Sequence, residues 1–340
     1  MVRVLIVDDS VFFRNMLSAR LTEDPEIEVV GRAVDSDDAM NQITRLNPDV
    51  MTLDVEMPKM NGIEFLKVLL KTRLIPVVLV SSLNINVFDA LSAGAVDFVR
   101  KPDMSRPESS AAFFSELRRK VKVASSAHVR ANRMNAPARV PLAGVGSRAD
   151  SMVIAIGAST GGTEATLDIV RNFPNDTPGM VIVQHMPPGF TKMYADRLNG
   201  ICKMEVREAV NGDEIRTGCI LIAPGDQHMS VFRNGTRYSV RCHGGDKVSG
   251  HRPSVDVLFS SMADQVKDKA VGVILTGMGR DGADGLLKMR KAGAYTIGQD
   301  EGSCVVYGMP MVAYEIGAVV TQSPLEKIPD AIAGGLRKKM

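Results

Sequence analysis

The chain has 340 residues, which is enough for two or three domains with substantial cores. Its composition, 45% hydrophobic and 24% charged, is ordinary for a soluble globular protein. A net charge of +2 gives no sign of a nucleic-acid partner across the whole surface. No apolar run approaches the roughly 20 residues of a membrane span, so direct membrane insertion is not expected.

The first ten residues, MVRVLIVDDS, turn acidic early and lack a cleavable signal pattern. The four cysteines form no C-x-x-C pair and are too few in a chain of this length to indicate a disulfide framework. These features together favour a reducing compartment, and we expect a cytoplasmic protein.

Residues 1–123 alternate between apolar runs and amphipathic stretches with helical spacing. The predicted strands are 2–7, 27–33, 50–54, 76–81 and 96–99. Five such strand–helix units predict a parallel sheet with helices on both faces.

Residues 124–150 break this periodicity. The segment is rich in Ala, Ser, Arg, Pro and Gly, and it carries four arginines against one aspartate. This composition predicts a mobile linker. The arginines could mark a nucleic-acid-binding arm, but arginines spread over such a segment are more often solvated charge.

Alternation resumes in residues 151–340 and predicts a second, larger α/β domain with a mostly parallel sheet. Its predicted strands are 152–156, 180–184, 219–223, 271–277 and 295–299. An antiparallel hairpin is also expected, because strands 229–232 and 237–242 flank the turn dipeptide Asn234-Gly235.

Charged and hydroxyl side chains follow four predicted strands of the first domain. Asp8 and Asp9 end the first strand, Asp54 the third and Ser81 the fourth, and Lys101 follows the fifth. The carboxyl ends of parallel strands share one edge of the sheet, where function gathers. Three converging carboxylates repel unless a hard cation such as Mg²⁺ joins them, and a lysine beside them could hold an anion. Each residue alone also fits a helix cap, a loop acid or a surface charge.

With these residues in place, the first domain resembles a response-regulator receiver domain. The resemblance implies that Asp54 accepts a phosphoryl group from a histidine kinase. The implied Mg²⁺ ligands are Asp8, Asp9, Asp54 and the backbone carbonyl of Glu56. The other implied positions are Ser81 and Lys101, which would contact the phosphoryl group, and Phe98, the switch aromatic.

The stretch 152-MVIAIGASTGGTEA-165 places Ser159 between a buried strand and a helix predicted over 163–171. Residues 157–161 fit the G-x-S-x-G elbow of a nucleophilic serine, in which small neighbours permit a sharp turn. They do not fit the dinucleotide pattern G-x-G-x-x-G. A glycine-rich turn with a serine helix cap remains the alternative.

A nucleophilic serine needs a base and an orienting acid. His185 directly follows a strand, as Ser159 does, and this position favours it over His228 as the base. A loop histidine bonded to nearby backbone is the alternative. Asp281, in 275-LTGMGRDG-282, offers the acid, although it also fits a helix cap. Candidate oxyanion donors are the backbone N–H groups of Thr160, Gly161 and Met278.

The segments GASTGGTEA, QHMPPGFT, APGDQHM, HRPSVDVLF, LTGMGRDGADG and SCVVYGMP, in this order, resemble the catalytic domain of the chemotaxis protein-glutamate methylesterases, the CheB family. The resemblance implies Ser159 as nucleophile, His185 as general base and then acid, and Asp281 as the orienting carboxylate, with no metal in this site. It further implies hydrolysis of γ-glutamyl methyl esters on the cytoplasmic domains of chemoreceptors, with release of methanol, and deamidation of receptor glutamines.

Joining the two domains suggests regulation. We expect the unphosphorylated receiver to block the Ser159 edge and phosphorylation of Asp54 to shift the population toward an open arrangement. Two other functions remain open at this point. A DNA-binding response regulator would carry a compact basic helical output domain. A catalytically silent nucleotide-binding domain would use the glycine loop for phosphate.

Overall fold

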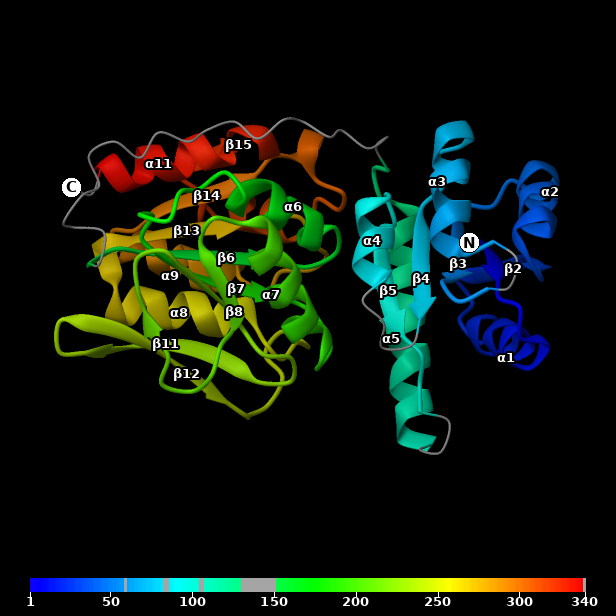
Figure 1. Ribbon diagram of the computed structural model, residues 1–340, viewed down its shortest axis with the longest axis horizontal. Coiled ribbons are helices and arrows are strands. Elements are labelled where there is room, and N and C mark those ends of the chain that lie inside the picture. The colour runs from blue at the N-terminus through cyan, green and yellow to red at the C-terminus, as the bar shows by residue number, and fades with distance from the viewer. Residues whose placement is uncertain (58–59, 82–85, 104–106, 130–150, 339–340) are drawn as a thin grey trace. The chain divides into compact units, whose positions relative to one another are not determined.

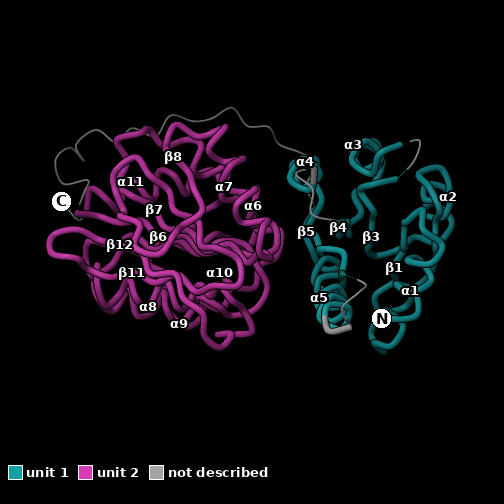
Figure 2. Tube along the Cα trace, turned by 60° about the horizontal axis from the view of Figure 1, so that its bottom comes forward, with its two compact units in different colours: residues 1–134 teal, residues 135–340 magenta. Residues whose placement is uncertain are grey.

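The computed structural model describes residues 1–57, 60–81, 86–103, 107–129 and 151–338. The chain divides into two compact units, residues 1–134 and 135–340 (Figure 2). Most of the predicted linker lies outside the described residues. Its predicted beginning at 124 falls inside a helix, because α5 (Pro107–Ser125) continues to Ser125.

The first unit contains a five-stranded parallel sheet in the order β2-β1-β3-β4-β5 (Figure 1). Its strands are β1 (Val2–Val7), β2 (Ile27–Ala33), β3 (Val50–Asp54), β4 (Val77–Ser81) and β5 (Asp97–Arg100). The other helices are α1 (Val11–Leu21), α2 (Ser36–Leu46), α3 (Gly62–Thr72) and α4 (Asn86–Ser92). Helix α1 packs against α5, and α3 packs against α2 and α4. Every residue of β3 and β4 is buried, which explains why these strands are mostly apolar.

The second unit is built on a seven-stranded parallel sheet in the order β15-β14-β13-β6-β7-β10-β8. Its strands are β6 (Val153–Ala158), β7 (Gly179–Gln184), β8 (Glu205–Glu208), β10 (Cys219–Ile222), β13 (Ala270–Ile274), β14 (Tyr295–Gln299) and β15 (Thr321–Ser323). The helices are α6 (Gly162–Val170), α7 (Phe190–Ile201), α8 (Val255–Gln265), α9 (Ala283–Lys291), α10 (Met309–Glu315) and α11 (Ile328–Lys338). The predicted α/β architecture is confirmed in both units.

A small antiparallel sheet forms the expected appendage. It contains β9 (Glu214–Ile215), β11 (His228–Asn234) and β12 (Arg237–His243). The predicted turn was wrong by one residue. Asn234 pairs with Arg237 inside the ladder, so the two loop residues are Gly235 and Thr236. Gly235 takes the left-handed conformation, with φ +60, which glycine adopts without strain.

Three short strands were missed, and the strand predicted over 271–277 extends three residues too far. Strands β8 and β15 lie at the two edges of the large sheet, and β9 has only two residues, so none carries a strong apolar period. Strand β13 ends at Ile274 rather than at 277. The next residues leave the ladder because Thr276 bonds across to the Ser159 loop.

The order of strands in the large sheet positions the site. Strand β6 lies between β7 and β13, and all three run parallel. The next strand in the chain, β7, lies on one side of β6, and the later strand β13 lies on the other side. The carboxyl end of β6 is therefore a topological switch point. Loops from three central strands therefore meet there. Among the described helices, none combines the length and apolarity that crossing a bilayer requires.

Candidate functional site

Ser159 sits directly after β6 in a tightly bonded turn. Its N–H donates to the Thr276 carbonyl at 3.0 Å, and its carbonyl accepts the Gly162 N–H at 2.7 Å and Gln184 Nε2 at 2.9 Å. The serine is 6% exposed. Gly161 has φ +75, and a Cβ there would lie 2.6 Å from Val305 Cβ. The glycines of the elbow are thus required by close packing around the serine.

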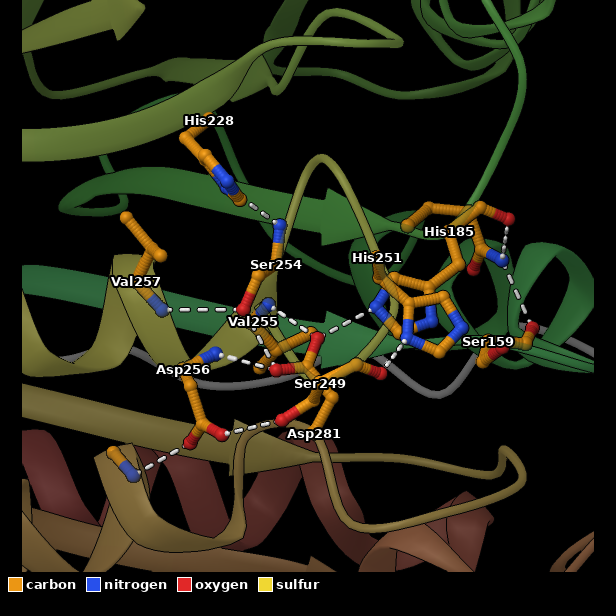
Figure 3. A network of polar contacts seen from close by, with 12 residues as sticks. Ser159, His185, His228, Ser249, His251, Ser254, Val255, Asp256, Val257 and Asp281 are labelled. Carbon is orange, nitrogen blue, oxygen red and sulfur yellow. Dashed lines mark hydrogen bonds and ion pairs between the residues drawn. The ribbon is translucent and has the colours of Figure 1, made fainter. Parts of the chain in front are cut away.

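His185 directly follows β7, and its N–H donates to the Ala158 carbonyl at 3.1 Å. This bond ties the ends of β6 and β7 together beside Ser159. The ring Nε2 lies 2.7 Å from Asp281 Oδ2. The other ring nitrogen, Nδ1, is buried and has no hydrogen-bond partner among the described residues. Figure 3 shows the His185 ring between the Asp281 carboxylate and Ser159.

Asp281 lies in the loop between β13 and α9 and is 1% exposed. Besides His185, it accepts Ser254 Oγ at 2.7 Å, Val255 N–H at 2.8 Å and Asp256 N–H at 3.1 Å (Figure 3). Burial alone would raise its pKa, but these donors and the adjacent imidazole outweigh burial and hold the pKa at about 2. An ionised Asp281 can only accept, so His185 Nε2 carries a proton, and a ring with one proton has its basic lone pair on Nδ1.

His228, the alternative base, has a different environment. It is buried, and its Nδ1 accepts the Ser254 N–H at 3.2 Å. Its Nε2 lies 2.9 Å from the Asp246 carbonyl, to which it donates. Both ring nitrogens are therefore bonded to backbone, and the residue connects β11 to the loop that carries Ser254.

The expected oxyanion donors lie around Ser159 along the backbone. Thr160 and Gly161 follow it directly and precede α6. Met278 follows Gly277, which packs so closely that a Cβ on Gly277 would lie 2.6 Å from Ser159 Cβ. Helix N-termini leave backbone N–H groups without intrahelical partners, which suits a developing negative charge.

A second histidine lies against His185. The rings of His185 and His251 are stacked, with centroids 3.8 Å apart and an interplanar angle of 5°. His185, His251 and Asp281 each offer a ligand atom within 4.8 Å of the others. A metal bonds an imidazole nitrogen in the plane of its ring, at about 2.0 Å. One ion cannot lie in two parallel planes, so this arrangement does not fit a shared metal.

The first unit gathers its acidic residues at the equivalent edge of its own sheet. Asp8, Asp9 and Asp54 each offer an oxygen within 4.8 Å of the others. Lys101 Nζ lies 2.6 Å from Asp54 Oδ2 and 3.4 Å from Asp8 Oδ2. Burial raises the pKa of Asp8 to about 6 against the opposing charge of Lys101. Burial likewise raises the pKa of Asp54. The three acids and the lysine predicted from the sequence are thus brought together.

The remaining predicted positions of the first unit lie nearby. Ser81 is fully buried, and its hydroxyl has no hydrogen-bond partner within the described part of the chain. Glu56 donates its N–H to Asp54 Oδ1 at 3.1 Å. Phe98 is buried in β5, and Lys120 Nζ lies 5.2 Å from the centre of its ring. An orphaned hydroxyl and an all-oxygen acidic set fit a phosphoryl group and a hard cation.

Sequence reasoning missed Ser254, Gln184 and the stacking of His251. Ser254 carries a recognisable signal, since a serine before VDVLF predicts an N-cap, and it does cap α8. Its bond to Asp281 joins residues 27 apart in the chain and has no local signal. Gln184 bonds two backbone carbonyls of the site and resembles any strand-terminal glutamine.

Comparison with known proteins identifies both units. Residues 154–332 match the family profile described as CheB methylesterase, and residues 4–108 match that of the response regulator receiver domain. This chain belongs to the CheB methylesterase family. The predicted receiver and methylesterase domains are therefore confirmed, and the DNA-binding and nucleotide-binding alternatives are set aside.

Relatives of this CheB family member align along nearly the whole chain. One from Syntrophomonas wolfei, named protein-glutamate methylesterase/protein-glutamine glutaminase 2, is 56% identical over 331 residues, covering 97% of this chain and 96% of its own. One from Syntrophotalea carbinolica is 50% identical over 347 residues, covering 99% and 98%. The solved Thermotoga maritima CheB methylesterase catalytic domain is 38% identical, with a TM-score of 0.53 over 54% of this chain and 97% of that one.

Proposed function

We propose that this protein hydrolyses γ-glutamyl methyl esters on the cytoplasmic domains of chemoreceptors and deamidates receptor glutamines, under the control of phosphorylation at Asp54. One observation carries the catalytic part. His185 is held by an ionised Asp281 at Nε2, and its Nδ1 is buried without a hydrogen-bond partner among the described residues, so it can accept a proton. The names of the relatives support the substrate class.

In the proposed reaction, Ser159 Oγ attacks the side-chain carbonyl of the substrate while His185 Nδ1 takes the hydroxyl proton. The Asp281 carboxylate stabilises the resulting imidazolium. Backbone N–H groups of Thr160, Gly161 and Met278 bind the oxyanion. The proton on Nδ1 then passes to the leaving methoxide, which departs as methanol.

The second half of the reaction repeats these roles with water. Nδ1 takes a proton from water, the hydroxide attacks the acyl-enzyme, and the same proton returns to Ser159 Oγ. The product is a glutamate side chain. With a glutamine substrate, the first leaving group is ammonia instead of methanol, and every later step is unchanged.

For the receiver, we propose that a chemotaxis histidine kinase phosphorylates Asp54. Mg²⁺ would be held by Asp8, Asp9, Asp54 and the Glu56 carbonyl, where it would offset the charge of the transferred phosphoryl group. Lys101 already contacts Asp54 and would bond the phosphoryl oxygens. The Ser81 hydroxyl, which has no hydrogen-bond partner among the described residues, would bond the same group.

We further propose that the unphosphorylated receiver inhibits the catalytic unit and that phosphorylation relieves the inhibition. The presence of two separate compact units in one chain supports this. Methanol release by residues 151–340 alone should then exceed that of the unphosphorylated full chain. Equal rates would contradict inhibition.

Methanol release from methylated receptor tests the catalytic proposal. Ser159→Ala should lower the rate by about 10⁴-fold or more, because the nucleophile is removed. Ser260→Ala, in α8, is the matched control, since that hydroxyl accepts a bond from Lys288 and should not affect the rate. Retention of activity by Ser159→Ala would show that the serine is only a turn residue.

A further inference from the structure

Within the described residues, His251 is the only residue whose ring stacks on that of His185. The two rings lie face to face in Figure 3. Their separation and near-parallel planes correspond to a full aromatic stack. The contact therefore covers one face of the imidazole to which we assign proton transfer.

The segment that carries His251 is itself held firmly. Val248 and His251 exchange two backbone hydrogen bonds of 3.1 and 2.9 Å across a turn formed by Ser249 and Gly250. His251 Nδ1 donates to the Ser249 carbonyl at 2.8 Å. Arg252 bonds Asp226 Oδ1 through two nitrogens, at 2.9 and 2.6 Å. The His251 ring is thus a fixed surface against which another ring can be positioned.

His185 needs such a surface. Its side chain is anchored at Nε2 by Asp281, but a hydrogen bond to a single nitrogen leaves the ring free to tilt about that point. Tilting would change the direction in which Nδ1, the proposed proton acceptor, points. Displacements of about 1 Å in a catalytic group cost roughly 10²-fold in rate. Contact with a parallel ring restricts this motion.

We propose that His251 is a positioning residue for the esterase reaction. Its ring holds the plane of the His185 imidazole so that Nδ1 faces Ser159, and its π face stabilises the imidazolium that forms when His185 accepts the serine proton. This inference rests on the proposed function, because it assigns His251 to the same proton transfer.

Steady-state kinetics of the full chain with methylated receptor test the assignment. His251→Ala should lower kcat roughly tenfold with little change in KM, which corresponds to the loss of one aromatic stack. His251→Phe keeps a flat ring and should recover most of kcat. A kcat for His251→Ala equal to wild type, or a His251→Phe variant as slow as His251→Ala, would overturn the proposal.

His243→Ala is the matched control. His243 also bonds a neighbouring carbonyl through Nδ1, that of Gly244 at 2.7 Å, but it is not stacked on His185. Its kcat should equal wild type. A loss equal to that of His251→Ala would show that histidines of this segment act only through folding, which would contradict a specific stack.

Nuclear magnetic resonance of the full chain separates this inference from the proposed function. The His185 Nε2 proton, bonded to an ionised carboxylate, should give a downfield signal that exchanges slowly with water. In His251→Ala the exchange should accelerate, and in His251→Phe it should not. Unchanged exchange in His251→Ala would refute positioning even if Ser159→Ala is inactive, whereas an active Ser159→Ala would refute only the esterase mechanism.

Discussion

Two buried aspartates, Asp281 and Asp8, show how the same residue type is used in opposite ways in the two units. Each follows a central parallel strand and is 1% exposed. The pKa of Asp281 is lowered to about 2, whereas that of Asp8 is raised to about 6. Burial raises both. The difference lies in the donors, since four groups donate to Asp281, whereas Asp8 accepts the Ser10 N–H and shares Lys101 with Asp54.

The two shifts have opposite consequences for stability. Asp281 has a folded-state pKa below its unfolded value, so its contribution is present above about pH 4 and is lost as the pH falls through about 2. Asp8 has a folded-state pKa above its unfolded value, so its contribution is present below about pH 4 and is lost as the pH rises through about 6. The ionised carboxylate of Asp281 is stabilised by its donors, whereas that of Asp8 would be stabilised further by a bound cation.

Of the changes that test this difference between Asp281 and Asp8, the largest expected effect is on catalysis. Asp281→Asn should lower kcat by about 10⁴-fold, because an amide can donate to Nε2 and favour the wrong tautomer of His185. Asp284→Asn, which removes an exposed partner of Arg280, is the control and should leave kcat unchanged. A loss of less than tenfold in Asp281→Asn would mean that the ionised carboxylate does not set the tautomer.

A buried cation in the receiver extends the comparison. Lys120 Nζ bonds Asp97 Oδ1 at 2.8 Å and the Phe98 carbonyl at 2.6 Å, and these acceptors, with Glu116, raise its pKa despite its burial. Lys120→Ala should lower the free energy of unfolding of the receiver by about 3 kcal/mol, because a buried charge pair is broken.

Denaturant unfolding of the full chain, followed through the receiver transition, measures this loss. Lys122→Ala, on the same helix but more exposed, should cost less than about 1 kcal/mol. Equal losses for the two variants would show that burial does not distinguish them.

Removing the charge of Asp8 should change the free energy of unfolding in the opposite direction. Asp8→Asn should raise the free energy of unfolding of the receiver by about 2 kcal/mol at pH 7, because an amide avoids the cost of a buried ionised carboxylate. The difference in free energy of unfolding between Asp8→Asn and the wild type should vanish near pH 4. It should become smaller when Mg²⁺ is added to the wild type. Asp9→Asn, at an exposed position, serves as the control. A pH-independent gain would rule out ionisation as its cause.

The smallest effect concerns a single donor to Asp281. Ser254→Ala removes the 2.7 Å bond to Oδ1 and the cap of α8, which should cost about 1 kcal/mol of stability and lower kcat several-fold. Ser260→Ala provides the comparison for hydroxyl loss on the same helix. If Ser254→Ala left both quantities unchanged, the backbone donors alone would suffice to hold Asp281.

Much of the fold was predictable because each core strand carries its own signal. Strands β1, β2, β3 and β14 have the predicted bounds. The edge strand β8, with the sequence EVRE, carries charge and was missed. The turn after β11 was displaced because Asn234 is paired in the ladder, which its identity as a turn former does not reveal.

The site was predictable in its parts and not in its contacts. Ser159, His185 and Asp281 could be predicted as neighbours because all three follow strands, and the parallel sheet brings these strand ends together. Which nitrogen of His185 meets Asp281 depends on ring orientation, which no sequence pattern encodes. The same holds for the stack on His251, since HRPS predicts a loop and gives no information about where its side chains point.

The position of β6 between β7 and β13 also orders events during synthesis. Its neighbours are made at very different times, and His185 and Asp281 are separated by 96 residues in the chain. When Ser159 and His185 have been synthesised, the nascent chain still has no β13 to complete the sheet and no Asp281 to bond His185. Pairing across such sequence distances is slow compared with local contacts. The contact between His185 and Asp281 therefore forms late, when the centre of the sheet closes.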